Sequence, residues 1–336
     1  MRLYRLPKAE SIDDLTLDEA PAPEPGRGEV LVRMRAASLN YRDLVVAKGR
    51  YSRAGTPANL VPLSDGAGEV VAVGPGVDRV AVGERVAPIF MQSWIAGPIS
   101  DAYAASALGG SADGVLAEQK VFDQHGLVPL PEHLSYEEGA TLPCAAVTAW
   151  NALFGERALQ PGQSVLLLGT GGVSIFALQF AKAAGARVII TSSSDRKLER
   201  AKALGADECL NYRRESEWQD QVRTLTGGRG VDHVVEVGGA GTLPRSLRAT
   251  RVGGSVHLIG VLTGGEIDPI LVMHRAVVLR GVRVGSRAHF EAMNQAIAVH
   301  QIHPEIDRVF PFEEVREAYR YLESQEHLGK VVVRLD

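Results

Sequence analysis

The chain has 336 residues and a formal net charge of −4, and 45% of its residues are hydrophobic. This length predicts two domains of an ordinary globular protein, the charge gives no indication of nucleic-acid binding, and no apolar run is long enough to span a membrane. The start of the chain lacks the apolar core of a signal peptide, and two cysteines provide no disulfide framework, so we expect a cytoplasmic protein.

Residues 1–130 predict a β-rich domain. Apolar and polar residues alternate at 29–36 and 68–74, as in strands with one buried face, and a Pro-Gly turn follows the second segment. Residues 91–113 are rich in Gly, Ala and Ser and show no periodicity. We expect a long loop there, and such loops are often functional.

Residues 131–285 predict a domain of the α/β class. Helical stretches alternate with apolar runs that are typical of strands buried on both faces, and these runs lie at 165–168, 187–191, 209–212, 231–239, 254–261 and 277–284. About six parallel strands form a doubly wound sheet. A helix is expected later at 312–324, and a strand at 329–335 is expected to return to the first domain.

A glycine turn after the first strand of this domain indicates a dinucleotide site. Gly169 and Gly171 carry no Cβ, so a ligand can approach the backbone, and the next helix opens with free N–H groups that favour a diphosphate. Ser174 replaces the third glycine of the usual pattern, but the strand–turn–helix–strand context supports the assignment. The residues expected to contact the cofactor here are Gly169, Thr170, Gly171, Gly172 and Val173.

The end of the second strand favours NADP(H) over NAD(H). NAD-preferring sites usually place a carboxylate there, whereas this chain has hydroxyl side chains, among them Ser192 and Ser193, which can donate to a 2′-phosphate. Arg196 and Lys197 follow and add positive charge, although they could also be a solvated helix start. Asp195 opposes this interpretation unless it caps the helix and points away.

Three segments resemble the medium-chain dehydrogenase/reductase superfamily. They are SLNYRD at 38–43, PLSDGAGEVV at 62–71 and LGKVV at 328–332. Together with the nucleotide domain, the resemblance extends over essentially the whole chain. Within the superfamily, segment 38–43 resembles the zinc-free quinone oxidoreductase branch.

The resemblance implies an architecture and an assembly. Residues 1–130 would form a GroES-like catalytic domain completed by 286–336, and residues 131–285 would form a Rossmann domain with a six-stranded parallel sheet. It also implies a homodimer, and the strand near 277–284 is a candidate edge for pairing with a second copy.

The resemblance also bears on the catalytic zinc ion of alcohol dehydrogenases. At the three ligand positions of those enzymes this chain has Asn40, Ser64 and Cys144, and only the cysteine keeps a ligand-type side chain. An amide, a hydroxyl and one thiolate make a poor zinc site, so we expect no metal, although Asp65 or Asp43 could substitute. Asp43 is expected to brace local structure and Cys144 to be a small buried residue.

Without a metal, the resemblance implies reduction of conjugated substrates, in which hydride adds to a carbon that is already electrophilic and the protein supplies positioning and a hydrogen-bond donor. Tyr51 resembles the proton donor proposed for related enoyl reductases, and Tyr41 is the second candidate. Asn40 could bind the substrate carbonyl or the nicotinamide ribose. Trp94 and Trp150 are candidates for the wall of a substrate pocket, with core packing as the alternative.

Further cofactor contacts are expected at several positions. Thr148 resembles a nicotinamide-contacting position, and Tyr212 and Lys330 are also expected to contact the dinucleotide. Strand ends on the cofactor side bring the backbone close to the ligand, at Gly238, Gly239, Gly260 and Val261. His257 lies inside an apolar strand and is expected to be a core residue.

Three functions stay open on this basis. The first is a zinc-independent, NADPH-dependent oxidoreductase that transfers hydride to a quinone or an α,β-unsaturated carbonyl, with a small molecule as its substrate. The first alternative is an alcohol dehydrogenase-type oxidoreductase of carbonyls and alcohols. The second alternative is a dinucleotide-binding protein without turnover.

Overall fold

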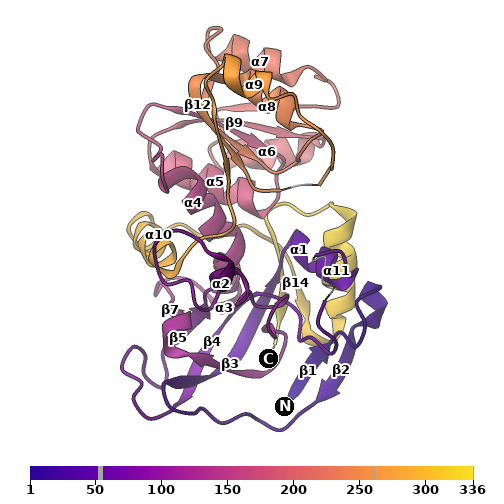
Figure 1. The fold of residues 1–336 in the computed structure, drawn as a ribbon, viewed down its shortest axis with the longest axis vertical. Helices are drawn as coiled ribbons and strands as arrows, with labels where there is room; N and C mark the ends of the chain where they lie inside the picture. Colours follow the sequence, from indigo (N-terminus) through magenta and orange to yellow (C-terminus); the bar gives the residue numbers. More distant parts are fainter. Residues whose placement is uncertain (52–55, 261, 336) are drawn as a thin grey trace. The chain divides into compact units, whose positions relative to one another are not determined.

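The computed structural model describes residues 1–51, 56–260 and 262–335, which Figure 1 draws from indigo to yellow. Val261, an expected cofactor contact, therefore lies outside the described residues. Within these residues, no helix is both long enough and apolar enough to cross a lipid bilayer.

The chain divides into two compact units. Unit 1 comprises Met1–Val147 and Gly285–Asp336, and unit 2 comprises Thr148–Val284. The first boundary expected from the sequence lies at residue 131, whereas the units meet at 147 and 148. The difference arises because helix α3 (Tyr136–Ala140) packs against the main sheet of unit 1.

Unit 1 is built on a mainly antiparallel sheet. Its strands are β3 (Glu29–Leu39), β4 (Asp65–Val73), β5 (Arg85–Pro88), β6 (Gln119–Asp123), β7 (Leu127–Pro129), β14 (Ile306–Pro311) and β15 (Lys330–Arg334). They follow the order β14-β15-β3-β4-β5-β7, and β6 also pairs with β3. A separate ribbon pairs β1 (Arg2–Arg5) with β2 (Thr16–Glu19).

The helices of unit 1 are short, apart from two near the end of the chain. They are α1 (Tyr41–Ala47), α2 (Asp101–Ala104), α3, α10 (Arg287–His300) and α11 (Val315–Ser324), with a π-helical turn at Leu142–Ala146. Helix α2 interrupts the loop expected at 91–113. The helix expected from residue 312 opens with a 3₁₀ turn, Phe312–Glu314, before α11 begins.

Strand β3 shows why this sequence forms a half-buried sheet. Val30, Val32 and Met34 are buried, while Arg33 between them is exposed, so the side chains alternate between the core and the solvent. Burying each of these apolar side chains contributes about 1.5–3 kcal/mol. Strand β15 pairs antiparallel with β3, with Val331 opposite Leu39. The expected return of the last strand to the first domain is therefore confirmed.

Unit 2 is an α/β domain with a parallel sheet of six strands. The strands are β8 (Ser164–Leu168), β9 (Arg187–Ser192), β10 (Glu208–Asn211), β11 (Val231–Glu236), β12 (Thr250–Leu258) and β13 (Val278–Gly281). Their order is β10-β9-β8-β11-β12-β13, which is doubly wound from the central β8. The fold class expected from the sequence is confirmed.

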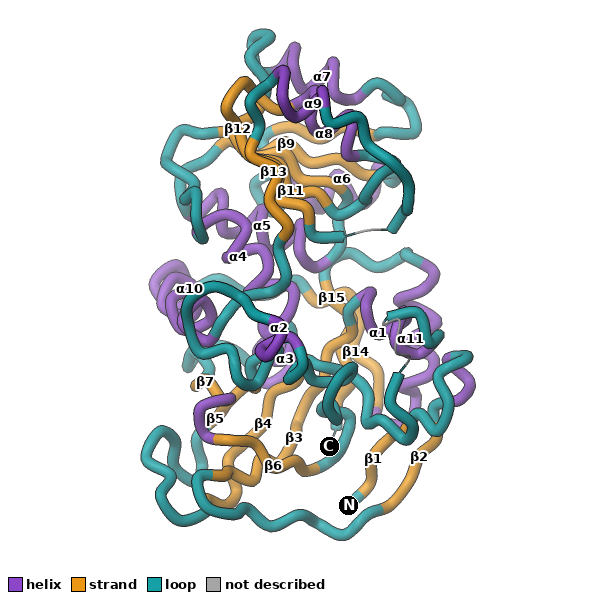
Figure 2. The backbone as a smooth tube through the Cα atoms, in the orientation of Figure 1, coloured by secondary structure: helices purple, strands orange, loops and turns teal. Residues whose placement is uncertain are grey.

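Helices connect these strands within unit 2. They are α5 (Gly172–Ala183), α6 (Asp195–Ala203), α7 (Trp218–Leu225), α8 (Leu243–Ala249) and α9 (Ile270–His274), and α4 (Val147–Phe154) leads into the unit. Figure 2 shows the strands of the sheet in orange, flanked by these helices in purple. Strands β8 and β11 are buried along their whole length, as expected of central parallel strands.

Candidate functional site

The end of β3 and the start of β15 form a buried polar cluster in unit 1. Because Val331 lies opposite Leu39, Lys330 lies next to Asn40, which directly precedes α1. The Lys330 ammonium is 3% exposed and donates to the Leu39 carbonyl oxygen and to Asn40 Oδ1, both at 2.6 Å. Asp43 accepts from the Asn40 backbone N–H at 2.7 Å, which is the bracing role expected for it.

Asp65 connects this cluster to Cys144. Its Oδ1 accepts from the Ser64 hydroxyl at 2.6 Å, and its Oδ2 accepts from the Cys144 backbone N–H at 3.0 Å. Both Ser64 and Asp65 are fully buried. Ser64 and Cys144 therefore both donate to the Asp65 carboxylate, and the Asn40 side chain interacts with the same carboxylate, so Asp65 joins the three positions that correspond to zinc ligands.

Burial shifts the protonation equilibria of this cluster. Burial raises the pKa of Asp43 to about 6, although the Arg42 guanidinium, 3.5 Å away, opposes the shift. Burial also raises the pKa of Asp65, with Lys330 opposing it, and lowers the pKa of Lys330, with Asp65 opposing it. Burial and then the Asp65 charge raise the pKa of the Cys144 thiol, so this thiol is protonated at neutral pH.

These residues do not fit a catalytic zinc ion, which needs three good ligands and one open position. Lys330 already occupies Asn40 Oδ1, and both oxygens of Asp65 accept hydrogen bonds from the protein. Lys330 and Arg42 supply two positive charges near the two buried carboxylates. Among the described residues, no three His, Cys, Asp or Glu side chains are arranged to hold a metal ion.

Tyr51 lies beside a second buried cation. The Arg42 guanidinium carbon is 4.5 Å from the centre of the Tyr51 ring and 4.6 Å from that of the Phe90 ring, so two aromatic rings sandwich it. Gly110 leaves the room for this packing, because a Cβ there would lie 2.4 Å from Arg42 Nη2. Tyr51 is 36% exposed, so part of this side chain faces solvent while its ring packs against Arg42. Tyr41 is 48% exposed at the start of α1.

A candidate dinucleotide site lies in unit 2, at the turn from β8 into α5. Gly169 has a φ of +71°, and a Cβ at Gly169 or Gly171 would meet no atom within 4 Å. The first helical bond runs from the Ile175 N–H to the Gly171 oxygen, so the N–H groups before it face outward from the helix end. Ser174 Oγ donates to the Leu168 oxygen at 2.7 Å and ties the helix to the strand. This open cradle fits the diphosphate of a dinucleotide.

The end of β9 presents hydroxyl groups, as expected. Ser192 is buried, and its Oγ accepts from the Ser194 N–H at 3.3 Å. The expectation that Asp195 caps α6 is wrong by one residue, because Ser194 holds the cap position. The Asp195 carboxylate accepts from Asn211 Nδ2 at 2.7 Å and pairs with the Arg214 guanidinium, so it is directed toward β10. Arg196 is exposed on the first turn of α6.

Packing inside unit 2 explains the glycines at two further strand ends. A Cβ at Gly260 would lie 2.2 Å from the Val237 oxygen, and one at Gly238 would lie 2.4 Å from Thr242 Oγ1. The buried Glu236 carboxylate accepts from the N–H groups of Gly238 and Gly239 and from the Thr242 hydroxyl. Close packing therefore accounts for these glycines, and their contact with a cofactor stays a prediction.

The remaining expected site residues lie in several settings. Trp94 is 4% exposed, donates to the Gly97 oxygen at 2.9 Å and stacks with Tyr103, so its ring is anchored within its own loop. Trp150 packs against Phe154 and Phe180. Thr148 and Thr170 are buried, whereas Tyr212 is 42% exposed. Their roles in binding stay predictions, as do those of Gly172, Val173, Ser193 and Lys197.

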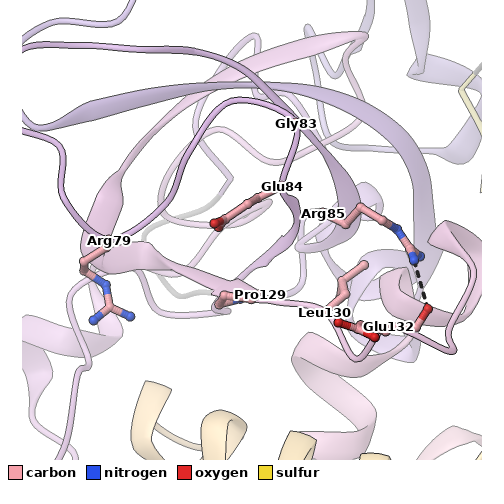
Figure 3. Close-up of a pocket in the computed structure, with 7 residues that line it drawn as sticks. All are labelled: Arg79, Gly83, Glu84, Arg85, Pro129, Leu130 and Glu132. Carbon is pink, nitrogen blue, oxygen red and sulfur yellow. Dashed lines mark hydrogen bonds between the residues drawn. The ribbon is translucent and has the colours of Figure 1, made fainter.

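A depression elsewhere in unit 1 shares no residue with these sets. Figure 3 shows its lining, which consists of Arg79, Gly83, Glu84, Arg85, Pro129, Leu130 and Glu132. The two arginines already have protein partners, since Arg79 pairs with Glu291 at 3.0 Å and Arg85 donates to the Glu132 oxygen at 3.3 Å. Nothing in this lining points to the chemistry of the polar cluster.

The sequence did not predict two contacts, that of Lys330 with Asn40 and that of Arg42 with Tyr51. The expected contact of Lys330 with the dinucleotide stays a prediction. The available signal for Lys330 was a lysine at the start of an apolar run, because lysine is almost never fully buried without a partner. No sequence signal indicated that Arg42 would meet Tyr51.

Known proteins match the chain over nearly its whole length. Residues 26–132 match the alcohol dehydrogenase GroES-like domain, and residues 172–299 match the zinc-binding dehydrogenase family. A zinc-type alcohol dehydrogenase-like protein, C1773.06c of Schizosaccharomyces pombe, is 46% identical over 96% of each chain. Quinone oxidoreductase of Rattus norvegicus is 31% identical over 93% of this chain and 91% of its own. The crystal structure of a putative alcohol dehydrogenase from Sinorhizobium meliloti 1021 has a TM-score of 0.91 and 40% identity, covering 100% of this chain and 99% of that one.

The names of these relatives bear on the three open functions. They favour the alcohol dehydrogenase-type alternative over the quinone reductase expectation, because both the family models and the relatives of higher identity carry alcohol dehydrogenase names. The quinone oxidoreductase matches with lower identity. The dinucleotide preference and the zinc status of this chain rest on its own residues.

Proposed function

Because the chain belongs to the medium-chain dehydrogenase/reductase superfamily and is an NAD(P)-dependent oxidoreductase, we propose that it transfers hydride from NADPH to a quinone or an α,β-unsaturated carbonyl without a catalytic metal ion. The observation that carries the proposal is the donor set of the polar cluster. Where zinc enzymes have ligands, Asn40 is held by a lysine, Ser64 is bonded to Asp65, and Cys144 is a protonated thiol.

The chain's own residues would polarise and position the acceptor. Asn40 Nδ2 is a buried donor; the Asp65 carboxylate engages at most one of its two N–H bonds, so the other is available to a carbonyl oxygen. Hydride adds at the electrophilic carbon, and the oxygen of the resulting enolate or quinol anion then takes a proton. Tyr51, oriented by Arg42, is the proposed donor of that proton.

The dinucleotide supplies the hydride when bound, and unit 2 offers the groups that would hold it. The turn at Gly169 and Gly171 would hold the diphosphate. Ser192, Ser193, Arg196 and Lys197 would hold the 2′-phosphate of NADPH. The pairing of Asp195 with Arg214 supports this preference, because the guanidinium charge partly offsets the repulsion between this carboxylate and the phosphate.

A second candidate is an alcohol dehydrogenase that acts on unconjugated carbonyls, as the name of the 46% identical relative suggests. Two acceptors that differ only in conjugation, 2-cyclohexen-1-one and cyclohexanone, separate the candidates. The chelator-treated protein is expected to oxidise NADPH with 2-cyclohexen-1-one or 1,4-benzoquinone and not with cyclohexanone. Reduction of cyclohexanone that requires added zinc would establish the second candidate instead.

The dinucleotide preference has its own test. NADPH is expected to bind at least about tenfold more tightly than NADH, because one charged contact contributes about 1.5–3 kcal/mol. Arg196→Ala should weaken NADPH binding and leave NADH binding unchanged. Equal affinities for the two dinucleotides would contradict the assignment. Tight NADPH binding with no acceptor consumed would support a binding protein without turnover.

A further inference from the structure

Lys330 makes two hydrogen bonds at residues 39 and 40. Its ammonium donates to the carbonyl oxygen of Leu39, whose peptide group leads into Asn40, and to Oδ1 of the Asn40 side chain. Both distances are 2.6 Å, and Lys330 is 3% exposed. The antiparallel register of β15 and β3 produces this contact between residues 290 positions apart. Lys330 therefore restrains both the backbone and the side chain at this position.

This contact decides which way the Asn40 amide points. An ammonium group can only donate, so the amide atom that faces Lys330 must be the oxygen. The amide NH₂ group is then directed away from Lys330. Nδ2 is buried and has no described partner at ordinary hydrogen-bond geometry; its one interaction, with the Asp65 carboxylate, engages at most one of its two N–H bonds and leaves the other free. A buried donor without a partner is unfavourable, and an oxygen of a bound molecule would satisfy it.

The charges around Lys330 explain why a lysine is tolerated in this interior. Asp65 and Asp43 attract its ammonium, and Cys144 lies in the same network through Asp65. A methionine of similar length could fill the space, but it could neither donate to Asn40 nor balance these carboxylates.

We propose that Lys330 is a positioning residue that holds the Asn40 amide with its NH₂ group free to donate to the carbonyl oxygen of the substrate. This inference rests on the proposed function, since it names how that site fixes its hydrogen-bond donor. It differs from the expectation that Lys330 contacts the dinucleotide, because a positioning role predicts a defect in acceptor reduction with dinucleotide affinity unchanged.

A double-mutant cycle tests the coupling of the two residues. The proteins are the wild type, Lys330→Met, Asn40→Ala and the double variant, with Lys8→Met on the exposed surface as the matched control. The readouts are kcat/KM for 2-cyclohexen-1-one at saturating NADPH, and Kd for NADPH from nicotinamide fluorescence. A third readout is the side-chain amide signal of Asn40 in ¹⁵N–¹H spectra of the protein without dinucleotide, assigned by its loss in Asn40→Ala.

The inference predicts strong non-additivity. Lys330→Met should lower kcat/KM by about 10- to 100-fold in the wild type, as expected for loss of a fixed donor, and by less than about threefold when Asn40 is already alanine. Kd for NADPH should stay within about twofold of the wild-type value, because the inference gives Lys330 no contact with the dinucleotide and distant sites that share no contact act independently. The Asn40 amide signal should shift in Lys330→Met and stay in place in Lys8→Met.

Other outcomes overturn the inference. Additive losses in the cycle, or a raised Kd for NADPH with unchanged acceptor kinetics, would assign Lys330 to the dinucleotide. If Lys330→Met does not fold because two carboxylates lose their cation, Lys330→Met in an Asp65→Asn background removes one charge of each sign and is measured instead. If the Asn40 amide signal is the same in Lys330→Met as in the wild type, the contact between Lys330 and Asn40 is excluded, even if no acceptor is reduced. Failure of the wild type with every conjugated acceptor would instead refute the proposed function.

Discussion

An asparagine at position 40 changes the chemistry of this site because an amide has a donor and an acceptor on the same planar group. Lys330 occupies the acceptor, so the donor keeps one direction. A cysteine here would need a cation to stabilise its thiolate. The structure instead places the Lys330 ammonium against the amide oxygen, and the two nearby buried carboxylates have Lys330 and Arg42 as their positive partners.

Tyr51 gives the most direct test of proton transfer at the residue scale. Removing its hydroxyl by Tyr51→Phe keeps the ring that packs on Arg42, so the fold should be unchanged. We expect kcat to fall by about 100-fold or more, because general acid catalysis contributes roughly that much. Steady-state kinetics with 2-cyclohexen-1-one measure this. A kcat within about twofold of the wild type would show that solvent supplies the proton.

The residues that could be predicted from the sequence differ from the others in how far apart along the chain their partners lie. The glycine turn and the hydroxyls after β9 could be predicted because each depends on a strand, a turn and a helix adjacent in sequence. The contacts of Lys330 with Asn40 and of Asp65 with Cys144 could not, because they depend on which strands pair and in which register.

At the scale of elements, the turn before β15 determines where Lys330 lies. Gly329 has a φ of +70°, and a Cβ there would lie 2.3 Å from the Glu305 carbonyl oxygen. Gly329→Ala should therefore lower the free energy of unfolding by about 2–4 kcal/mol, through backbone strain and through displacement of this backbone. It should also reduce acceptor turnover, because Lys330 follows directly.

A second glycine distinguishes the effect of backbone strain on stability from the effect of a steric clash. Gly83 also has a positive φ, +93°, but a Cβ there would meet nothing within 4 Å. Gly83→Ala should lower the free energy of unfolding by only about 1 kcal/mol. Urea unfolding of this variant and of Gly329→Ala measures both effects. Equal losses in the two variants would mean that the Glu305 contact contributes nothing.

Strands β11 and β12 hold a buried pair of neutral histidines. His233 Nδ1 and His257 Nε2 are 3.1 Å apart, and the rings stack with their centroids 5.4 Å apart. Burial lowers the pKa of His233 to about 4 and that of His257 to about 3. His257 is 1% exposed, which agrees with its expected place in the core.

This pair predicts a loss of stability in acid. The unfolded chain binds protons on both histidines near pH 6.5, while the folded chain does not, so their contribution is complete above about pH 6.5 and is lost as the pH falls toward 4. His257→Leu should reduce the decline in unfolding free energy between pH 7.5 and pH 4.5 by about 2 kcal/mol. Asp43, with its pKa raised to about 6, acts in the opposite sense but is common to both proteins. Parallel stability curves for the two proteins would contradict this account.

Periodicity alone identified most elements of unit 2, since its strands are short apolar runs between helices. Helix α3 follows the boundary expected at residue 131, and only its packing against the strands of unit 1 groups it with that unit. Helix α2 is four residues long, too short for a periodic signal.

At the scale of the whole molecule, we propose a homodimer formed through the edge strand β13. This strand ends the six-stranded sheet, and Val278 on it is 36% exposed. A second copy could extend the sheet across a twofold axis. Light scattering after size exclusion should give twice the mass of 36.0 kDa, and Val278→Lys should shift the protein toward that single-chain mass. A wild-type protein that is monomeric at all concentrations would contradict the proposal.

Hydride transfer without a catalytic metal ion can be tested on a single preparation of this protein. Metal content by mass spectrometry and NADPH-dependent turnover of 2-cyclohexen-1-one are determined on the same chelator-treated sample, before and after addition of zinc. The account predicts full turnover at less than about 0.05 zinc ions per chain, a level far below the one ion that a catalytic zinc site requires, with no gain on adding zinc. Turnover that falls with zinc content and returns when zinc is restored would contradict it.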